Sequence, residues 1–316
     1  MKPLKALLVA ATMLAPLATH AKPASAAKPV PMVVPGFADF LAIDGDTVWA
    51  TNRFSVEQWS LKGKKLETPM SRPCGGMSVD YGALWVADCP EGAVKRVDVT
   101  TGKLLATIST GIANHMEGEL NTVTGAGSAW IASEASGKIA RIDAATNKIV
   151  ASIPTAPGSW YLAFGLGSLW AVSGKEQLLS RIDPATNTVT GTVALGKMPG
   201  FLVAGEGAVW VQEQGDGTVA RIDPTTMQVT ARIKVGDNLK YGDIDVGGGK
   251  VWLRTTDDQE FVVIDAATNA ILTRVGKPVH SGGLRWTPKG VWTSAHDFHL
   301  LTWWPKGSET AKPSGR

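Results

Sequence analysis

A short phrase recurs seven times along this chain: a glycine-rich turn, an apolar residue and then tryptophan. Its tryptophans are Trp49, Trp85, Trp130, Trp170, Trp210, Trp252 and Trp292. Successive copies lie 36, 45, 40, 40, 42 and 40 residues apart. A period near forty residues, with short β patterns between the marks, is typical of a β-propeller in which each repeat forms one blade. The sequence therefore predicts an all-β, seven-bladed β-propeller, with the tryptophans packed between neighbouring blades.

Each repeat divides into four short strands. In the fourth repeat the patterns lie at 161–165, 169–173, 178–183 and 188–194. They are β-branched or alternating, and Gly, Pro, Asn or Asp bounds each of them. No stretch keeps a 3.6-residue period, so almost no helix is expected.

The two ends of the repeat region complement each other. The last repeat has three strand patterns, at 280–285, 291–295 and 300–304, and then becomes polar. An additional strand pattern at 30–34 precedes the first repeat. We expect this segment to supply the fourth strand of the last blade and to close the ring, because closure removes open sheet edges. A disordered tail is expected at 305–316.

The N-terminus has the order of a secretory signal peptide: two lysines, an apolar run at 6–17 and then small residues. The apolar run is too short to span a bilayer. We expect residues 1–26 to be removed, with cleavage after Ala21 or Ala26, and the protein to be periplasmic or secreted. A buried N-terminal helix is the alternative. The propeller domain then comprises residues 27–304.

Charge gives no indication of nucleic-acid binding. The whole chain is formally +3, and three of its lysines lie within the first 26 residues, which hold no acidic residue. The remainder is close to neutral, without a long basic run or a second long apolar segment. Binding to nucleic acid and membrane insertion are therefore not expected.

Two cysteines, Cys74 and Cys89, are the only ones in the chain. A two-residue hairpin turn at Tyr81 and Gly82 would place them directly opposite each other on paired strands, close enough for a disulfide. An exported chain meets an oxidising compartment, so we expect the bridge to form. Free or metal-binding thiols are the alternative.

A second phrase recurs at the turn between the third and fourth strands, typically Arg-Ile-Asp-x-x-Thr-Asn. Its aspartates are Asp98, Asp143, Asp183, Asp223 and Asp265. Repeated carboxylates could indicate metal sites. An Asp that opens a turn and accepts backbone N–H hydrogen bonds, followed by Asn or Gly in the left-handed conformation, is the simpler interpretation.

The variable loops point to one face as the functional one. Connections between blades and connections between the second and third strands share one face of a propeller, here called the top face. These loops differ between repeats, which is where a scaffold places its specificity. The histidines outside the signal segment all fall in them: His115, His280, His296 and His299.

Two polar clusters on the top face are candidate sites. In an extended segment His115, Glu117 and Glu119 would point to one side and could hold a divalent cation such as Mg²⁺; a solvated polar rim is the alternative. In the last blade His280 and His296 could be catalytic, with an imidazole as general base, or could be surface histidines.

Further top-face residues could form a small-ligand site. An aromatic concavity with a few polar groups is what such a site requires. The candidates from this register are Trp160, Phe201, Lys240, Tyr241, Asp243, Glu213 and His299.

The repeated Gly-x-Leu/Val-Trp and Arg-Ile-Asp-Pro-x-Thr-Asn phrases resemble those of the YVTN-type and virginiamycin B lyase-like (streptogramin lyase-like) seven-bladed propellers, over nearly all of 37–304. The resemblance implies a top-face site in which the lyase opens a cyclic depsipeptide by elimination, with a magnesium ion, a histidine and carboxylates. His280 matches the first histidine of that motif, and His296 approximately matches the second. The motif's glutamate positions hold Pro278 and Ser294 or Ala295.

Two functions remain open from the sequence. The first is an exported, monomeric propeller that binds a small molecule, a peptide or a protein on its top face, without a cofactor. The second is a metal-assisted lyase or hydrolase in which His115, Glu117, Glu119 and His280 rebuild the site, with a bound cation stabilising the developing negative charge. No haem-attachment or glycine-rich phosphate motif supports a redox or nucleotide-dependent propeller.

Overall fold

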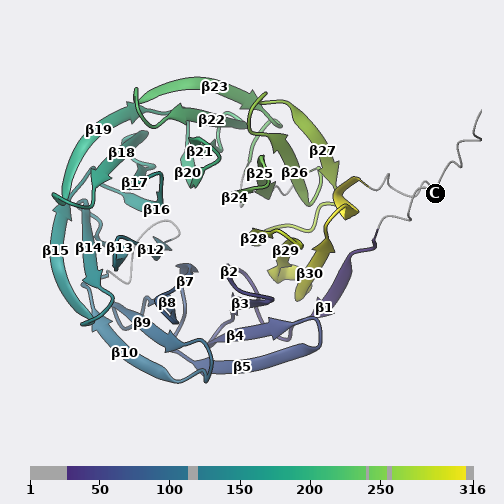
Figure 1. The fold of residues 1–316 in the computed structure, drawn as a ribbon, viewed down its shortest axis with the longest axis horizontal. Helices are drawn as coiled ribbons and strands as arrows, with labels where there is room; N and C mark the ends of the chain where they lie inside the picture. The colour runs from purple at the N-terminus through teal and green to yellow at the C-terminus, as the bar shows by residue number, and fades with distance from the viewer. Residues whose placement is uncertain (1–26, 113–119, 240–241, 255–257, 311–316) are drawn as a thin grey trace, which may run out of the picture.

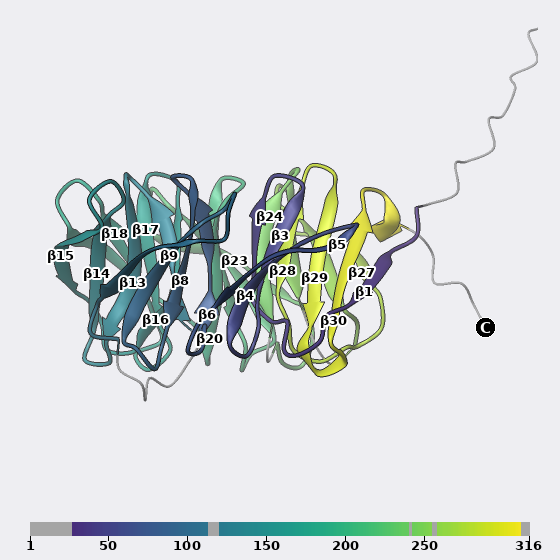
Figure 2. The ribbon, with the colours of Figure 1, turned by 90° about the horizontal axis from the view of Figure 1, so that it is seen from below.

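The protein is a seven-bladed β-propeller, as the tryptophan spacing predicts (Figure 1). The computed structural model describes residues 27–112, 120–239, 242–254 and 258–310. Seen from the side, the blades form a flat disc with loops on two opposite faces (Figure 2). Within the described part of the chain, helix is limited to the two 3-10 turns η1 (His296–Phe298) and η2 (Ser308–Thr310), and neither is long enough to cross a membrane.

Every blade is a four-stranded antiparallel sheet. Blades 1 and 2 are β2 (Leu41–Asp44), β3 (Thr47–Thr51), β4 (Ser55–Ser60), β5 (Gly63–Pro69), then β7 (Ser78–Asp80), β8 (Ala83–Asp88), β9 (Ala93–Asp98) and β10 (Leu104–Ser109). Blades 3 and 4 are β12 (Val123–Gly125), β13 (Ser128–Glu134), β14 (Lys138–Asp143), β15 (Lys148–Pro154), then β16 (Ser159–Gly165), β17 (Ser168–Ser173), β18 (Leu178–Asp183) and β19 (Thr188–Ala194). Blades 5 and 6 are β20 (Pro199–Gly205), β21 (Ala208–Glu213), β22 (Thr218–Asp223), β23 (Gln228–Lys234), then β24 (Asp243–Gly247), β25 (Lys250–Arg254), β26 (Phe261–Asp265) and β27 (Ile271–Val275). Blade 7 combines β28 (Leu284–Thr287), β29 (Gly290–Ala295) and β30 (Leu300–Pro305) with β1 (Val30–Val33), and a short parallel pair joins β6 (Gly75–Gly76) to β11 (Leu120–Asn121).

The first strand of each blade lines the central channel, and the fourth lies on the outer wall (Figure 1). The recurring tryptophans sit on the second strand and are buried between blades; Trp130 and Trp170, for example, are fully buried. Each indole N–H of these two donates to a backbone oxygen of its own blade, that of Gly125 or Gly165, at 3.0 Å. The rings therefore have their polar atom satisfied inside the core, which confirms that they are packing residues.

The predicted ring closure is confirmed. Strand β1 pairs antiparallel with β30, with Val30 opposite Trp303 and Val33 opposite Leu300. The Val34 N–H extends the pairing to the carbonyl of His299 at 2.7 Å. Of the predicted disordered tail, Pro305 ends β30 and 308–310 form η2, where the Thr273 hydroxyl donates to the carbonyl of Glu309 at 3.3 Å. Residues 311–316 lie outside the described part.

The repeated aspartates are turn residues, as the simpler interpretation states. The Asp143 carboxylate accepts the backbone N–H of Thr146 at 2.8 Å and its hydroxyl at 2.7 Å, and these hydrogen bonds lower the pKa of Asp143. Asn147 then adopts the left-handed conformation, with φ of 58°. This geometry leaves no free ligand set for a metal ion at the turn.

The arginine of the same phrase joins neighbouring blades. Arg141 lies over Trp130 of its own blade, 4.6 Å from the ring centroid, and reaches the third-to-fourth-strand turn of the next blade. There its Nη1 donates to the carbonyl of Pro184 at 2.6 Å and to Asn187 Oδ1 at 2.8 Å. Equivalent crossing hydrogen bonds, here called arginine latches, run from Arg96 to Asn147 and from Arg181 to Pro224. Blade 1 has a shorter version, from Gln58 to the carbonyl of Val99.

The predicted disulfide between Cys74 and Cys89 is present, with a Cα–Cα distance of 5.9 Å. The hairpin turn at Tyr81 and Gly82 also has the predicted register, since Ser78 lies opposite Trp85. The pairing shifts before the cysteines are reached, because Pro73 rather than Cys74 bridges to Asp88. The bridge therefore closes an irregular end of the hairpin at the top face.

Removing this bridge is expected to destabilise the fold. The double substitution Cys74→Ser/Cys89→Ser should lower the free energy of unfolding by about 3 kcal/mol, because the unfolded chain regains the freedom of the closed loop. Urea unfolding of the variant beside the oxidised and reduced wild type measures it. An unchanged midpoint in both the variant and the reduced protein would contradict the prediction.

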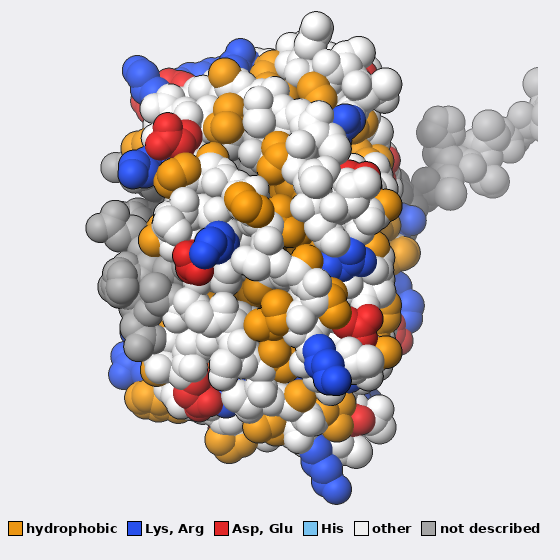
Figure 3. All heavy atoms as spheres, turned by 90° about the vertical axis from the view of Figure 1, so that its left-hand side faces the viewer, with side chains coloured by type: hydrophobic (Ala, Val, Ile, Leu, Met, Phe, Trp, Pro, Cys, Tyr) orange, Lys and Arg blue, Asp and Glu red, His pale blue; other side chains and the backbone are white. Residues whose placement is uncertain are grey.

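Side chains of both charges occur on the side of the outer wall that carries β15. There Lys and Arg side chains are interspersed with Asp and Glu, between small groups of hydrophobic side chains (Figure 3). Such mixing does not create the single-sign field that steers polyanions.

Candidate functional site

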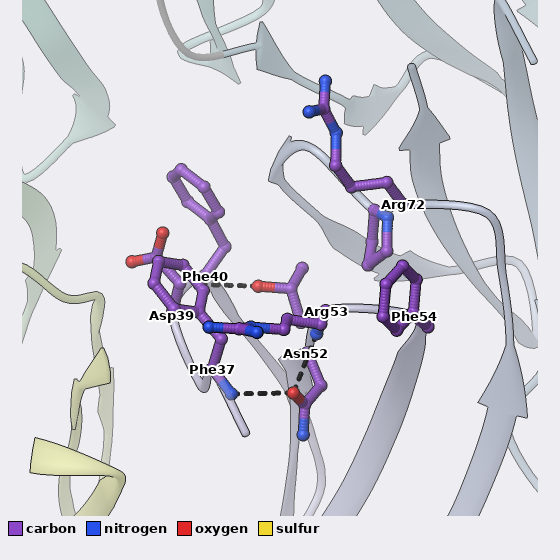
Figure 4. Close-up of a pocket in the computed structure, with 9 residues that line it drawn as sticks. Phe37, Asp39, Phe40, Asn52, Arg53, Phe54 and Arg72 are labelled. Carbon is purple, nitrogen blue, oxygen red and sulfur yellow. Dashed lines mark hydrogen bonds between the residues drawn. The ribbon is translucent and has the colours of Figure 1, made fainter. Parts of the chain in front are cut away.

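The top face holds an open pocket of about 340 Å³ between blades 1 and 2 and the channel (Figure 4). Its walls come from three neighbouring segments of the chain: the segment before β2, the loop between β3 and β4, and the segment that follows β5. The lining residues are Phe37, Asp39, Phe40, Thr51, Asn52, Arg53, Phe54, Arg72 and Pro73. Three phenylalanines and one proline give it an apolar interior, and two arginines and one aspartate supply charge.

Asn52 holds the first wall in place. Its Oδ1 accepts the backbone N–H groups of Phe37 and Arg53, both at 2.7 Å, and its Nδ2 donates to the carbonyl of Pro35 at 2.9 Å. Gly36 has φ of 111°, and a Cβ there would lie 2.2 Å from Asn52 Oδ1. Only glycine allows this approach, so the loop that carries Phe37 is fixed by local sequence.

Asp88 holds the second wall. This fully buried carboxylate accepts the backbone N–H of Ser71 at 3.0 Å and that of Arg72 at 3.1 Å. The next residue, Cys89, is tied to Cys74 by the disulfide. The bridge and the carboxylate together fix the backbone from which Arg72 projects.

The two arginines at the pocket are available to a ligand. Neither guanidinium group makes a side-chain hydrogen bond or ion pair with any described residue, and both side chains are exposed. The Arg53 side chain extends across the pocket toward Phe37 and Asp39, whereas Arg72 rises from the opposite side beside Phe54 (Figure 4). Phe54 is 69% exposed, which is high for an aromatic ring of this size. Guanidinium groups beside aromatic rings are suited to an anionic ligand with an apolar body.

Asp39 is the titratable group of the pocket. Burial, with the neighbouring Asp243 carboxylate, raises the pKa of Asp39 to about 7, although the Arg254 guanidinium opposes the shift. Arg254 is fully buried and donates to the carbonyl groups of Glu260, His280 and Ser294 at 2.9–3.1 Å. Near neutral pH the pocket therefore contains a carboxyl group that both accepts and releases protons.

The structure brings the predicted histidines His280 and His296 to the edge of the same region. The His296 ring stacks on Phe37 with centroids 4.1 Å apart, and partial burial lowers the pKa of His296. Its Nδ1 lies 2.9 Å from Asp297 Oδ1, but the contact lacks hydrogen-bond geometry. His280 stacks on Phe298, with centroids 5.6 Å apart.

The structure corrects the position of His280. It lies in the loop before β28 with φ of 57°, and does not open the strand. His299, predicted as a ligand-binding residue, instead contacts the carbonyl of Gly36 through Nδ1 at 2.5 Å. It therefore ties η1 to the segment that closes the ring.

Phe201, a predicted ligand-binding residue of the top face, is buried. Its ring meets that of Phe40 from the opposite side of the channel, with centroids 6.5 Å apart, and Tyr161 at 5.1 Å. Phe40 also lines the pocket, so these three rings extend from the pocket wall into the channel. A smaller polar cavity of about 160 Å³ has Asp243, Asp245 and Arg285 in its lining.

The remaining predicted ligand-binding residues have structural contacts. Glu213 is fully buried and accepts hydrogen bonds from Gly196, Thr218 and Arg232, so it does not point up from the top face. Asp243 is buried and accepts the N–H of Leu284 and a hydrogen bond from Arg285. Trp160 packs against the apolar cluster around Cys74. Lys240 and Tyr241 lie outside the described residues.

Among the described residues, the positions of the family motif do not supply the metal ligands that the resemblance implies. Pro278 has no ligating side chain, and the Ser294 hydroxyl is engaged with the carbonyl of Asp39 and the N–H of Gly283. Across the described ranges, no group of three or more His, Cys, Asp or Glu side chains is arranged to hold a metal ion. The predicted metal ligands His115, Glu117 and Glu119 lie outside those ranges.

The pocket residues Asp39, Arg53, Phe54 and Arg72 were not predicted. These four residues have no counterparts in the other repeats, because none of them belongs to a repeated phrase. The only local signal is the Asn-Arg-Phe sequence between β3 and β4, where an exposed phenylalanine interrupts a polar loop.

Fold and pocket together define a closed seven-bladed propeller with a concave top-face site. Among solved structures, the chain is similar to virginiamycin B lyase from Staphylococcus aureus, with a TM-score of 0.74 and 17% identity over 87% of this chain and 98% of that one. A streptogramin B lyase structure matches with a TM-score of 0.75 and 16% identity, covering 87% and 96%. BamB from Moraxella catarrhalis matches with 0.63 and 14% identity, covering 85% of each chain. No family model and no curated protein matches the sequence. At these identities the likeness establishes the fold, in agreement with the resemblance of the repeated phrases.

Proposed function

We propose that this protein is a binding protein whose ligand occupies the top-face pocket. The observation that carries the proposal is the combination of three phenylalanines with two unpaired guanidinium groups, within the described residues, around one cavity. Ligand sites are typically concave and mostly apolar, with a few polar groups that fix orientation. The ligand that fits this chemistry is an organic anion with an aromatic or apolar body: a small molecule, or the corresponding side chain of a peptide or protein.

A panel of aromatic carboxylates tests this proposal, with 3-phenylpropionate and its neutral amide as the first pair. The carboxylate should bind roughly tenfold more tightly than the amide, because it alone gains charge-assisted hydrogen bonds from Arg53 or Arg72. Isothermal titration calorimetry measures both affinities.

The matched variants are Arg53→Ala, Arg72→Ala and, as control, Lys62→Ala in the turn between β4 and β5. Each arginine variant should remove most of the preference for the carboxylate, whereas the control should keep it. If the acid and its amide bind equally to all four proteins, the assignment of the arginines is wrong.

A second candidate function rests on the proton-transfer groups at the same place. Asp39, with its pKa near 7, and His296 on the adjacent Phe37 ring could serve as acid and base in a lyase or hydrolase. The test is incubation with a streptogramin B, followed by chromatography and mass spectrometry for the linear product. Linearisation that His296→Ala abolishes would support this candidate; an intact substrate after long incubation would remove it.

We also propose that the chain is exported and acts as a monomer. The N-terminal segment has the order of a signal peptide, and the Cys74–Cys89 bridge suits an oxidising compartment. The mass of the protein recovered from the periplasm or medium tests export, because cleavage after Ala21 or Ala26 predicts two distinct masses. Recovery of only the full-length chain from the cytoplasm would contradict it.

A further inference from the structure

The seam between blades 7 and 1 lacks the arginine latch that joins neighbouring blades from blade 2 to blade 5. In blades 2, 3 and 4 an arginine opposite the core tryptophan crosses to the next blade. In blade 7 the residue opposite Trp292 is Trp303, whose ring lies 5.1 Å from that of Trp292. Trp303 therefore takes the place of the guanidinium over the core ring. The described structure shows no hydrogen bond from its side chain to blade 1.

A pocket of about 380 Å³ lies where the latch would cross, on the bottom face. Its apolar walls are Trp292, Trp303 and Leu61, and Leu61 belongs to the turn of blade 1 that corresponds to the latch acceptor. Asp46 and Lys289 stand at the rim. Their ion pair spans 2.6 Å, and both side chains are more than two-thirds exposed.

The chain itself indicates the ligand chemistry. At the equivalent places Arg96 and Arg141 lie 5.0 and 4.6 Å from their tryptophan rings and bond to turn oxygens of the neighbouring blade. The seam between blades 7 and 1 has no arginine at this place. It offers an indole face from Trp303, the turn that carries Leu61, and the carboxylate of Asp46. The Asp46–Lys289 pair opposes entry only weakly, because ion pairs between exposed side chains contribute little net stability.

We propose that this bottom-face pocket binds the arginine side chain of a peptide or protein partner. The guanidinium stacks on Trp303 and pairs with Asp46, and Lys289 moves aside into solvent. The site is independent of the top-face pocket and of its proposed ligand, so either can fail without the other.

The test uses the tripeptide acetyl-Gly-Arg-Gly-amide and its neutral analogue with citrulline in place of arginine. The arginine peptide should shift the indole N–H resonance of Trp303 saturably in a proton–nitrogen NMR titration, with the resonance assigned from Trp303→Phe. The citrulline peptide should bind roughly tenfold more weakly, since it lacks the cation.

Two variants at exposed positions keep the fold intact. Asp46→Asn should weaken the arginine peptide several-fold, and Lys289→Ala should strengthen it by freeing Asp46. Arg53→Ala, on the opposite face, should leave it unchanged. The proposal is overturned if the two peptides bind equally or if neither shifts the Trp303 resonance. Maltose serves as a neutral ligand that can stack on an indole ring, and a shift with maltose but not with the arginine peptide would also overturn the proposal.

Discussion

Replacing Asp39 with asparagine is expected to stabilise the protein at pH 8, by up to about 4 kcal/mol, and to leave its stability at pH 3.5 nearly unchanged. The folded state raises the pKa of this carboxyl group from 3.8 to about 7. Each pKa unit corresponds to about 1.4 kcal/mol, so above pH 7 the folded protein carries the full cost of an ionised, poorly solvated carboxylate. Asparagine removes that charge at every pH.

The sign follows from proton binding. Between pH 3.8 and about 7 the folded state holds the Asp39 proton and the unfolded state has lost it, so wild-type stability decreases as the pH rises through this window. Asp245, with its pKa raised to about 6 mainly by burial, adds a decrease in the same direction. Urea unfolding at pH 3.5, 5.5 and 8 measures the difference, with Asp46→Asn as the exposed control. A variant that is less stable than wild type at pH 8 would show that Asp39 is held there by a favourable ionic contact.

Replacing Arg254 with methionine is expected to cost about 3–5 kcal/mol, because it removes one member of a buried charge network and leaves the others uncompensated. The side chain donates hydrogen bonds to three backbone carbonyl groups, two of them in the next blade. Its positive charge stabilises the negative charges of three nearby carboxyl groups, those of the buried Glu260 and Asp243 and of the partly buried Asp39. Thermal unfolding at pH 8 should show a large decrease in Tm.

The double variant Asp39→Asn/Arg254→Met separates charge from packing. If Asp39 and Arg254 interact through charge, part of the loss should be recovered in the double variant relative to the sum of the single changes. Strict additivity, or a loss below about 1 kcal/mol for Arg254→Met alone, would contradict the network.

The fold could be predicted because its determinants repeat. The tryptophan spacing gives the blade number, and counting from Trp170 gives the strands of blade 4 to within two residues. Ring closure by β1 follows from a missing strand at one end and an extra one at the other. The disulfide follows from the Tyr81–Gly82 turn, although the ladder shifts near the cysteines.

For the candidate site, the sequence predicts the face of the propeller on which it lies but not the residues that form it. The top-face loops are irregular. Counting residues from the nearest tryptophan therefore does not predict the direction of a loop side chain. Glu213 is a predicted ligand-binding residue of the top face, but hydrogen bonds from Arg232 and Thr218 hold its carboxylate inside the blade. The charge interaction between Asp39 and Arg254 exists only because the ring closes, and no local pattern predicts an interaction between the first and sixth blades.

The arginine latches divide the ring into two parts. From blade 1 to blade 5 each junction has a repeated bottom-face hydrogen bond, from Gln58, Arg96, Arg141 and Arg181. In blades 6 and 7 the same position holds Val263 and Trp303. There the contacts between blades are unrepeated and polar, such as those of Arg254 and of Asp245 with the N–H of Trp286. The bottom-face pocket lies at the edge of this second part, next to the ring closure.

The pairing of β1 with β30 also sets the order in which the molecule can be completed. Val30 is synthesised early, yet its partner Trp303 is synthesised near the end of the propeller. Blades 1 to 6 can form from contacts that are local in sequence, whereas the seventh must wait for the whole chain. Until then, one hydrophobic blade edge stays open at each end of the growing arc. Chaperone dependence and aggregation of nascent chains should therefore be concentrated in the interval before the last thirty or so residues are made.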